Sequence, residues 1–164
     1  MPKQRVKATK LSLNLPFDLG GIELEPDETQ QRAAWKLYVE LTTRIAVQPL
    51  ALDEGLVREA LNSLYSLFGT TREVLKEAGP EVGAAPDTVG GIAIAVLNRG
   101  LRPILAKWHP RLQAWEAQRP PNVSAKEHEL KWPEEPQLRA ELETLRAELT
   151  QYASALADIA GVKE

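Results

Sequence analysis

The 164-residue sequence predicts an all-α protein, an antiparallel helical bundle of about four main helices plus short helices, with an N-terminal β-like arm or hairpin. Three observations predict this class. Apolar residues recur at three- and four-residue spacings over long segments, as in amphipathic helices. Proline or glycine follows where these segments stop. Apolar and polar residues alternate near the N-terminus, so we divide the chain into an arm or β-hairpin over 1–26 and a helical bundle domain over 27–164.

The arm has the pattern of two short strands. Leu11, Leu13 and Leu15 alternate with polar residues, as do Ile22 and Leu24, and two glycines lie between the runs. Such alternation is typical of strands that bury one face. A lone hairpin is marginally stable in water, so we expect the arm to pack on the body or to pair with another strand. Its strand edges also suit addition to a partner's sheet.

Two amphipathic helices are expected after the arm. The first covers 27–48, where Asp27 is a good N-cap, an apolar face extends to Ile45, and a proline follows. The second covers 53–78, where the carboxylate of Asp53 is placed to cap the start and a Gly-Pro pair follows the end. Apolar residues repeat along one face of each segment, so both helices should contribute to a shared core.

The most apolar helix is expected to begin near Thr88. Its apolar residues lie nearly all round, which indicates a central helix. Gly90 and Gly91 are small enough to allow a close helix crossing. Pro103 lacks an N–H and predicts a kink or a break, and Pro110 predicts the start of a further short helix.

The last helix is expected from about Glu135 to Ala160, with Gly161 as its stop. A short capped turn that begins at Ser124 should precede it. The apolar stripe of the last helix keeps strict four- and three-residue spacing over Leu138, Leu142, Leu145, Leu149, Tyr152, Leu156 and Ile159. A narrow strict stripe is typical of a coiled-coil seam, which predicts docking of a partner helix or of a second copy of the chain.

Composition and motifs argue against several function classes. The absence of cysteine excludes disulfides, thiolate catalysis and sulfur-ligated zinc. The two histidines lack the Glu-x-x-His spacing of a di-iron site, and there is no phosphate-binding loop or nucleophile elbow. We therefore expect no enzyme activity and no cofactor or metal.

The apolar run Ile92–Leu97 is far shorter than the roughly 20 residues of a membrane span, and no apolar segment follows the basic N-terminal residues. These observations predict a cytoplasmic protein with no membrane contact. The net charge of −3 argues against a protein whose main task is to coat nucleic acid.

The stretch 99–119 combines bases with tryptophans and holds a single acid, Glu116. Its basic and tryptophan residues are Arg99, Arg102, Lys107, Trp108, Arg111, Trp115 and Arg119. Arginine with tryptophan is the composition of protein-interface hot spots, and it also suits stacking on nucleic-acid bases. The alternative is structural: the bases pair with acids of the same chain, and Trp108 packs in the core.

We predict a non-enzymatic interaction protein, an accessory subunit or adaptor of a larger cytoplasmic assembly such as a bacterial defence or signalling system. Its partner would be another protein or a second copy. The predicted partner-binding residues are Leu11, Leu13, Leu15, Arg99, Arg102, Trp108, Arg111, Trp115, Leu138, Leu142, Leu145 and Leu149.

Two alternatives stay open. One is a nucleic-acid-binding accessory protein that uses 99–119 and the basic N-terminus, although the net charge of −3 disfavours it. The other is a regulatory helical bundle that binds a small ligand where Gly100 and Pro103 open the core.

Overall fold

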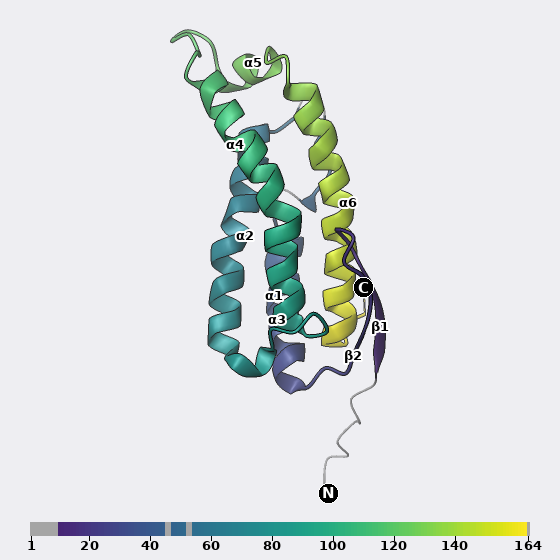
Figure 1. Cartoon of the computed structure of the whole chain (residues 1–164). Coiled ribbons are helices and arrows are strands. Elements are labelled where there is room, and N and C mark those ends of the chain that lie inside the picture. Colours follow the sequence, from purple (N-terminus) through teal and green to yellow (C-terminus); the bar gives the residue numbers. More distant parts are fainter. Residues whose placement is uncertain (1–9, 45–46, 52–53, 164) are drawn as a thin grey trace, which may run out of the picture.

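A computed structural model describes residues 10–44, 47–51 and 54–163 (Figure 1). These residues are mostly helical, and a small antiparallel hairpin lies near the N-terminus. The predicted basic N-terminal segment, the apolar residue Ile45 and the cap Asp53 lie outside the described residues.

Strand β1 (Leu11–Leu15) pairs with β2 (Gly20–Leu24), so that Leu11 faces Leu24 across the ladder and Leu15 faces Gly20. Phe17 and Asp18 have φ angles of 59° and 57°, so the turn lies at 16–19 rather than at the glycines, which belong to β2. Leu13, Leu15 and Leu24 point inward and are buried, as the alternation predicts.

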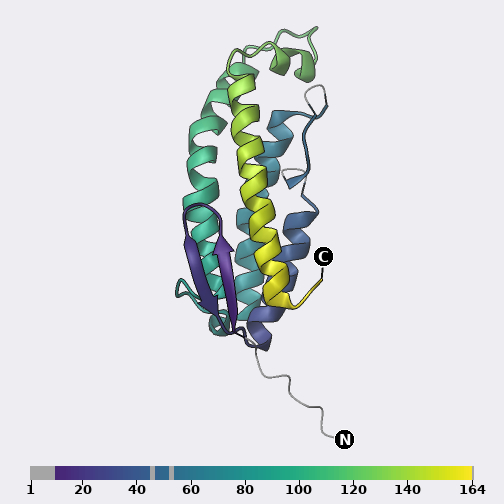
Figure 2. The same cartoon turned by 90° about the vertical axis from the view of Figure 1, so that its right-hand side faces the viewer.

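The hairpin packs on the helices of the same chain (Figure 2). The Gln151 side chain donates to the Asn14 carbonyl at 3.1 Å, and the Phe17 amide donates to the Glu148 carboxylate at 3.3 Å. A Cβ at Gly100 would lie 2.8 Å from the Phe17 ring, which shows how closely the turn approaches the helix. The predicted packing of the arm on the body is therefore confirmed.

Helix α1 (Glu28–Thr42) begins as predicted, because the Asp27 carboxylate accepts the Gln30 amide at 2.8 Å. It ends at Thr42, several residues earlier than the sequence pattern suggested. Helix α2 (Val57–Ala78) buries the expected stripe and ends at Gly79, whose φ of 81° terminates the helix.

Helix α3 (Val89–Ala95), the π-helical segment η3 (Val96–Leu101) and α4 (Arg102–Glu116) form one continuous helix. Of the predicted kink or break, the break does not occur, and the irregularity before Pro103 is a π-helical segment. Pro103 has no N–H to donate, and its ring crowds the preceding turn. The wider π turn accommodates the missing hydrogen bond and the ring, so the helix continues. Pro110 lies inside α4 and does not begin a new helix. Thr88 caps the start, since its hydroxyl accepts the Gly91 amide at 3.1 Å.

Gly90 and Gly91 face a loop rather than another helix. Added Cβ atoms would collide with the carbonyl oxygens of Gly83 and Ala85. This loop follows the short 3-10 helix η2 (Pro80–Val82). The prediction of a close helix crossing is thus corrected: the small residues admit the backbone of the loop between α2 and α3.

Helix α5 (Ala125–Leu130) is capped as predicted, because the Ser124 hydroxyl accepts the Glu127 amide at 3.1 Å. Helix α6 (Glu135–Ala160) has the predicted bounds, and Gly161 follows it with a φ of 76°. Every residue of its predicted apolar stripe is buried, and α6 packs against α1, α2 and β1.

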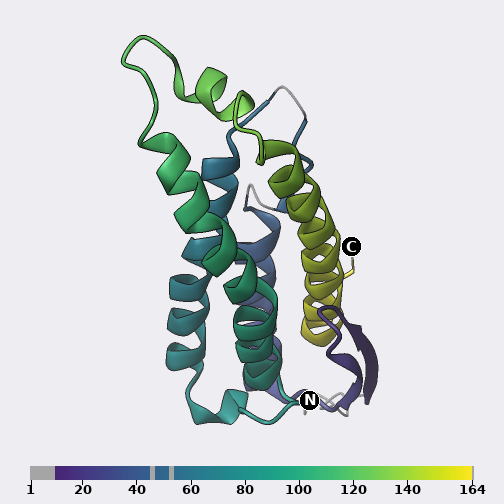
Figure 3. The same ribbon diagram turned by 45° about the horizontal axis from the view of Figure 1, so that its top comes forward.

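The long helices α1, α2, α3–η3–α4 and α6 lie side by side (Figures 1 and 3). Helix α5 lies at one end of them and the hairpin lies toward the other. Among the described residues, the continuous helix Val89–Glu116 is the one that is long and apolar enough to cross a membrane, and more than half of its most apolar window is buried inside the fold. Ile94 of this helix is 43% exposed, so one side of it faces solvent and it is not enclosed all round as its composition predicts.

Candidate functional site

Most of the leucines predicted to bind a partner are core residues. Leu13 and Leu15 are 6% and 7% exposed, and Leu11 is half-buried against the same core. On α6, Leu138, Leu142, Leu145 and Leu149 are all buried. The apolar stripe of α6 packs against α1, α2 and β1 of the same chain. These leucines therefore belong to the core, and the prediction that they bind a partner is corrected.

The two tryptophans of the basic stretch hold α4 to the elements that follow it. Trp108 is fully buried, donates its Nε1–H to Glu141 and meets Trp132 edge-on at 5.8 Å between ring centroids. Trp115 stacks on His128 at 4.4 Å and donates to the His128 carbonyl at 2.8 Å. The structural alternative is therefore confirmed for Trp108, and Trp115 is half-buried by its contact with α5.

The bases of the same stretch fall into two groups. Lys107 forms an ion pair with Glu141 at 3.0 Å, and Arg111 forms one with Glu134 at 2.9 Å, as the structural alternative predicts. Arg99 is exposed. The Arg102 guanidinium donates to the Asn98 amide oxygen at 3.2 and 3.3 Å, which leaves its positive charge without a neutralising carboxylate in that contact.

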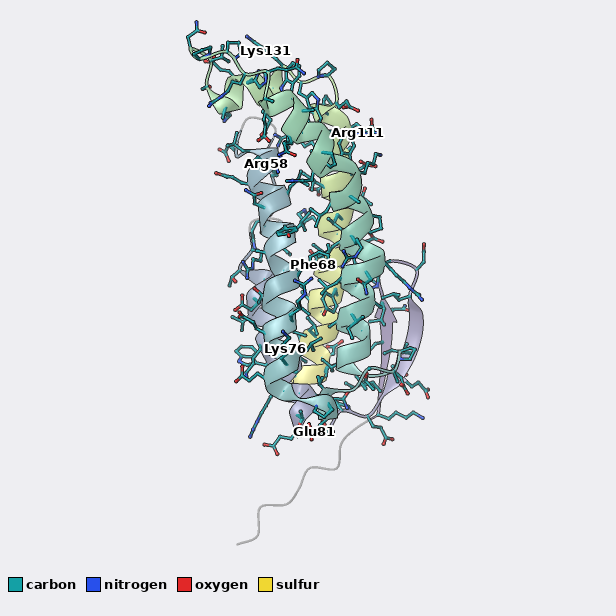
Figure 4. All side chains as sticks on the ribbon, turned by 60° about the vertical axis from the view of Figure 1, so that its left-hand side comes forward. Arg58, Phe68, Lys76, Glu81, Arg111 and Lys131 are labelled. Carbon is teal, nitrogen blue, oxygen red and sulfur yellow. The ribbon has the colours of Figure 1, made fainter. Side chains whose placement is uncertain are left out.

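Arg102 lies on a groove between α2 and α4, which we name the α2–α4 groove. Its volume is about 650 Å³, within the range of small-ligand pockets. Its lining residues are Leu61, Asn62, Tyr65, Phe68, Arg72, Arg102, Leu105, Ala106 and His109. Figure 4 shows this side of the molecule, where Phe68 lies about midway between Arg58 and Lys76 along α2.

Phe68 forms an aromatic floor that two arginines share. The Arg72 Cζ lies 5.8 Å from the ring centroid, and the Arg102 Cζ lies 5.0 Å from it. Each such cation–π contact contributes about 0.5–1 kcal/mol at an exposed site. Within the described part of the chain neither guanidinium forms an ion pair, and the groove lining contains no acidic residue. The side chains that line the groove therefore carry a net positive charge.

Arg58 organises the end of the groove nearest to α5. Its guanidinium binds both Glu116 oxygens at 2.6–3.1 Å and donates to the His109 Nδ1 at 3.0 Å. Because Arg58 has only donors, His109 Nδ1 must accept, which places the imidazole proton on Nε2. Arg58 also neutralises Glu116, which is the acid of α4 closest in sequence to His109.

The buried Glu129 carboxylate fixes the turn of α2 that carries Arg58. It accepts the amides of Val57 at 2.6 Å and Arg58 at 3.4 Å, in place of a local cap. Burial raises the pKa of Glu129, and the two amide donors and the Arg139 charge oppose that shift. A carboxylate from α5 thus supplies the N-terminal cap of α2.

Tyr65 lies on the rim of the groove and is 71% exposed, with its ring 6.3 Å from that of Phe68. Sequence reasoning missed Tyr65 and Arg72, and it assigned the apolar residues of 53–78, which include Phe68, only to the shared core. Their spacing of three and four places all of them on one side of α2, and this was the available signal. The approach of Arg102 from α4 depends on tertiary packing, which no local spacing reveals.

The polar groups that line the groove are mainly hydrogen-bond donors. These groups are guanidinium, imidazole, phenol and amide. Across the described ranges, no group of three or more His, Cys, Asp or Glu side chains is placed to hold a metal ion. No protein-family model matches the chain, and no match was found among curated proteins or solved structures.

Proposed function

We propose that this chain is a non-enzymatic interaction protein that docks a protein partner through the α2–α4 groove. One observation supports this most directly. The highly exposed Tyr65 stands beside Arg72 and Arg102, whose charges meet over Phe68 without a carboxylate partner in the described chain. Tyrosine and arginine are enriched among residues that dominate binding energy, and a groove lets them be desolvated together.

The fold fits the role of a rigid accessory subunit or adaptor. We propose that its long helices form an antiparallel helical bundle, with 89–116 as a core helix and not a membrane span. The hairpin and the α6 stripe stabilise this body. We place the protein in the cytoplasm as part of a larger assembly, for example a bacterial defence or signalling system.

The geometry of His109 supports a binding role. An imidazole that acts as a general base needs a free ring nitrogen directed at a reacting group. The Nδ1 of His109 already accepts from Arg58, and the groove lining holds no serine, cysteine or carboxylate to serve as a nucleophile. Removal of the imidazole should therefore affect affinity and not a chemical step.

The small-ligand alternative receives no support at the position where it was expected. The Phe17 ring lies against Gly100, so the widened turn before Pro103 is covered by the hairpin. Nucleic-acid binding keeps one favourable observation, the two arginines at the Phe68 ring. Lys107 and Arg111 are neutralised by ion pairs, which leaves fewer bases on α4 to contact phosphates. We therefore rank nucleic-acid binding second.

Affinity purification of the tagged full chain tests the proposal. The wild type is compared with Arg72→Gln/Arg102→Gln, and with Arg32→Gln/Lys36→Gln as a control that removes the same charge from the exposed side of α1. We expect wild type and control to capture a stoichiometric protein partner, and the groove variant to lose it. Capture that is equal in all three proteins, or capture of nucleic acid alone, would contradict the proposal.

A further inference from the structure

We infer that the α2–α4 groove receives a short acidic segment of the partner protein, whose carboxylates bind Arg72 and Arg102 and whose apolar side chain packs beside them. This inference rests on the proposed function and specifies the ligand of that same site. It follows from the charge, the preorganisation and the shape of the groove.

The positive charge of the groove favours an anionic ligand. Arg72 contacts the Phe68 ring, and Arg102 uses Nε and Nη2 to hold Asn98. Among the described residues, further N–H donors of both guanidiniums therefore stay available for a ligand. The lining residues include no carboxylate that competes for them. The guanidinium fork matches a carboxylate in a bidentate pair, which is stronger than a neutral hydrogen bond.

Both cations are held in place before a ligand arrives. They come from different helices and meet over a ring that is only 6% exposed. Asn98, one turn before Arg102 on the same continuous helix, fixes the second guanidinium. Side chains that are ordered in advance lose less entropy on binding, so this pair is better suited to recognition than freely rotating surface arginines.

Apolar surface adjoins the cations. Leu61 and Leu105 contribute the buried part of the lining, Ala106 is small, and the Tyr65 ring stands at the rim. A volume of about 650 Å³ accommodates one large side chain with its neighbours and is too small for a whole amphipathic helix. A short segment with one aromatic or leucine anchor between acids therefore fits best.

The remaining polar groups suit a peptide backbone. The His109 Nε2 carries a proton because Nδ1 accepts from Arg58, and Asn62 supplies an amide on α2. These donors can bond to carbonyl oxygens of an extended segment, whereas the arginines take its carboxylates. Arg58 is a positioning residue here, since it orients His109 and neutralises Glu116 without lining the groove itself.

The inference is tested by selecting peptides on the full chain. A library of random heptapeptides displayed on phage is selected on the wild type and counter-selected on Arg72→Gln/Arg102→Gln. We expect enriched sequences to carry Asp or Glu next to Phe, Tyr or Leu. Enrichment of neutral or basic sequences, or no enrichment, would overturn the inference.

Fluorescence anisotropy of the enriched peptides then measures the contribution of each charge. Changing their acids to amides, or using Arg72→Gln/Arg102→Gln, should weaken binding by about tenfold or more. The control Arg32→Gln/Lys36→Gln should bind as the wild type does. Equal binding by the amide peptides would overturn the acidic-segment inference. So would binding of an oligothymidylate, and not of the peptides, through the same arginines.

The failure of this inference is distinct from failure of the proposed function. If purified complexes still lose their protein partner on Arg72→Gln/Arg102→Gln while no acidic peptide binds, the groove remains the docking face and only its ligand class is wrong. If the groove variant keeps its partner, the proposed function itself is wrong.

Discussion

The buried face of α6 and the α2–α4 groove are built from the same helical spacing, yet one is closed and the other is open. On α6, leucines three and four residues apart pack against other helices and are buried. On α2, Tyr65, Phe68 and Arg72 have comparable spacing and border a groove of about 650 Å³. Spacing shows which residues share a side of a helix, whereas tertiary packing determines whether that side is covered.

The two regions should therefore respond to mutation in opposite ways. Full burial of one leucine contributes about 1.5–3 kcal/mol to folding. An exposed arginine–aromatic contact contributes about 0.5–1 kcal/mol. Changes on the α6 face should lower stability, and changes in the groove should lower partner binding with little effect on stability.

The largest expected effect is that of Leu145→Asp, which places a charge at a position only 2% exposed. An unpaired charge inside the core costs several kcal/mol, so the chain should lose its helical circular dichroism or melt far below the wild type. Ala147→Asp, on the exposed side of the same helix, is the matched control and should fold normally. Unchanged melting of Leu145→Asp would show that this face is not core.

A smaller effect is expected where the hairpin meets the π turn. Gly100→Ala places a methyl group 2.8 Å from the Phe17 ring, which must move, and we expect a loss of about 1–2 kcal/mol in urea unfolding. Gly69→Ala meets nothing within 4 Å and should stabilise α2 by about 0.5–1 kcal/mol. Stabilisation by both substitutions would mean that the hairpin does not dock at Gly100.

Glu129 gives stability a predictable pH dependence. Burial raises the pKa of its carboxyl, so the folded chain holds that proton more tightly than the unfolded chain does. Its contribution to stability is greatest below the unfolded pKa and is lost as pH rises through the folded pKa. Glu129→Gln removes this titration and keeps an oxygen that can accept the Val57 amide. The unfolding free energy of wild type relative to this variant should therefore be lower at about pH 7 than at about pH 4.

Urea unfolding at both pH values measures that difference. Glu127→Gln, on the exposed side of α5, controls for the loss of one acid from the same helix. A wild-type advantage that grows with pH would contradict the assignment of burial as the dominant cause.

Arg72→Gln/Arg102→Gln should change stability by no more than Gly100→Ala does, although it removes the proposed ligand contacts. Two exposed cation–π contacts are lost, so the unfolding free energy should stay within about 2 kcal/mol of the wild type. Thermal melting checks this, and partner binding of the same preparation should fall sharply. A variant that unfolds would place these arginines in the fold and not in a binding face.

Features set by neighbouring residues were predictable from the sequence. The caps Asp27 and Ser124, the helix start near Thr88 and the stop at Gly161 depend on local hydrogen bonds and backbone angles, and the structure has all of them. The bounds of α6 follow from the same local rules.

Features set by distant contacts were not predictable. The π turn at 96–101 keeps a helix continuous through Pro103, and a carboxylate from α5 caps α2. For the site, the sequence singled out Arg102, but nothing local predicts that Arg102 on α4 approaches the same ring as Arg72 on α2.

Site-specific photocrosslinking tests the central claim most directly. A benzoyl-phenylalanine is placed at Tyr65, on the groove, or at Trp35, an exposed aromatic of α1 that is 46% exposed. The full chain is then irradiated in cells. We expect a discrete protein adduct from position 65 and none from position 35. An adduct from position 35 alone would contradict the assignment of the α2–α4 groove as the partner-binding face.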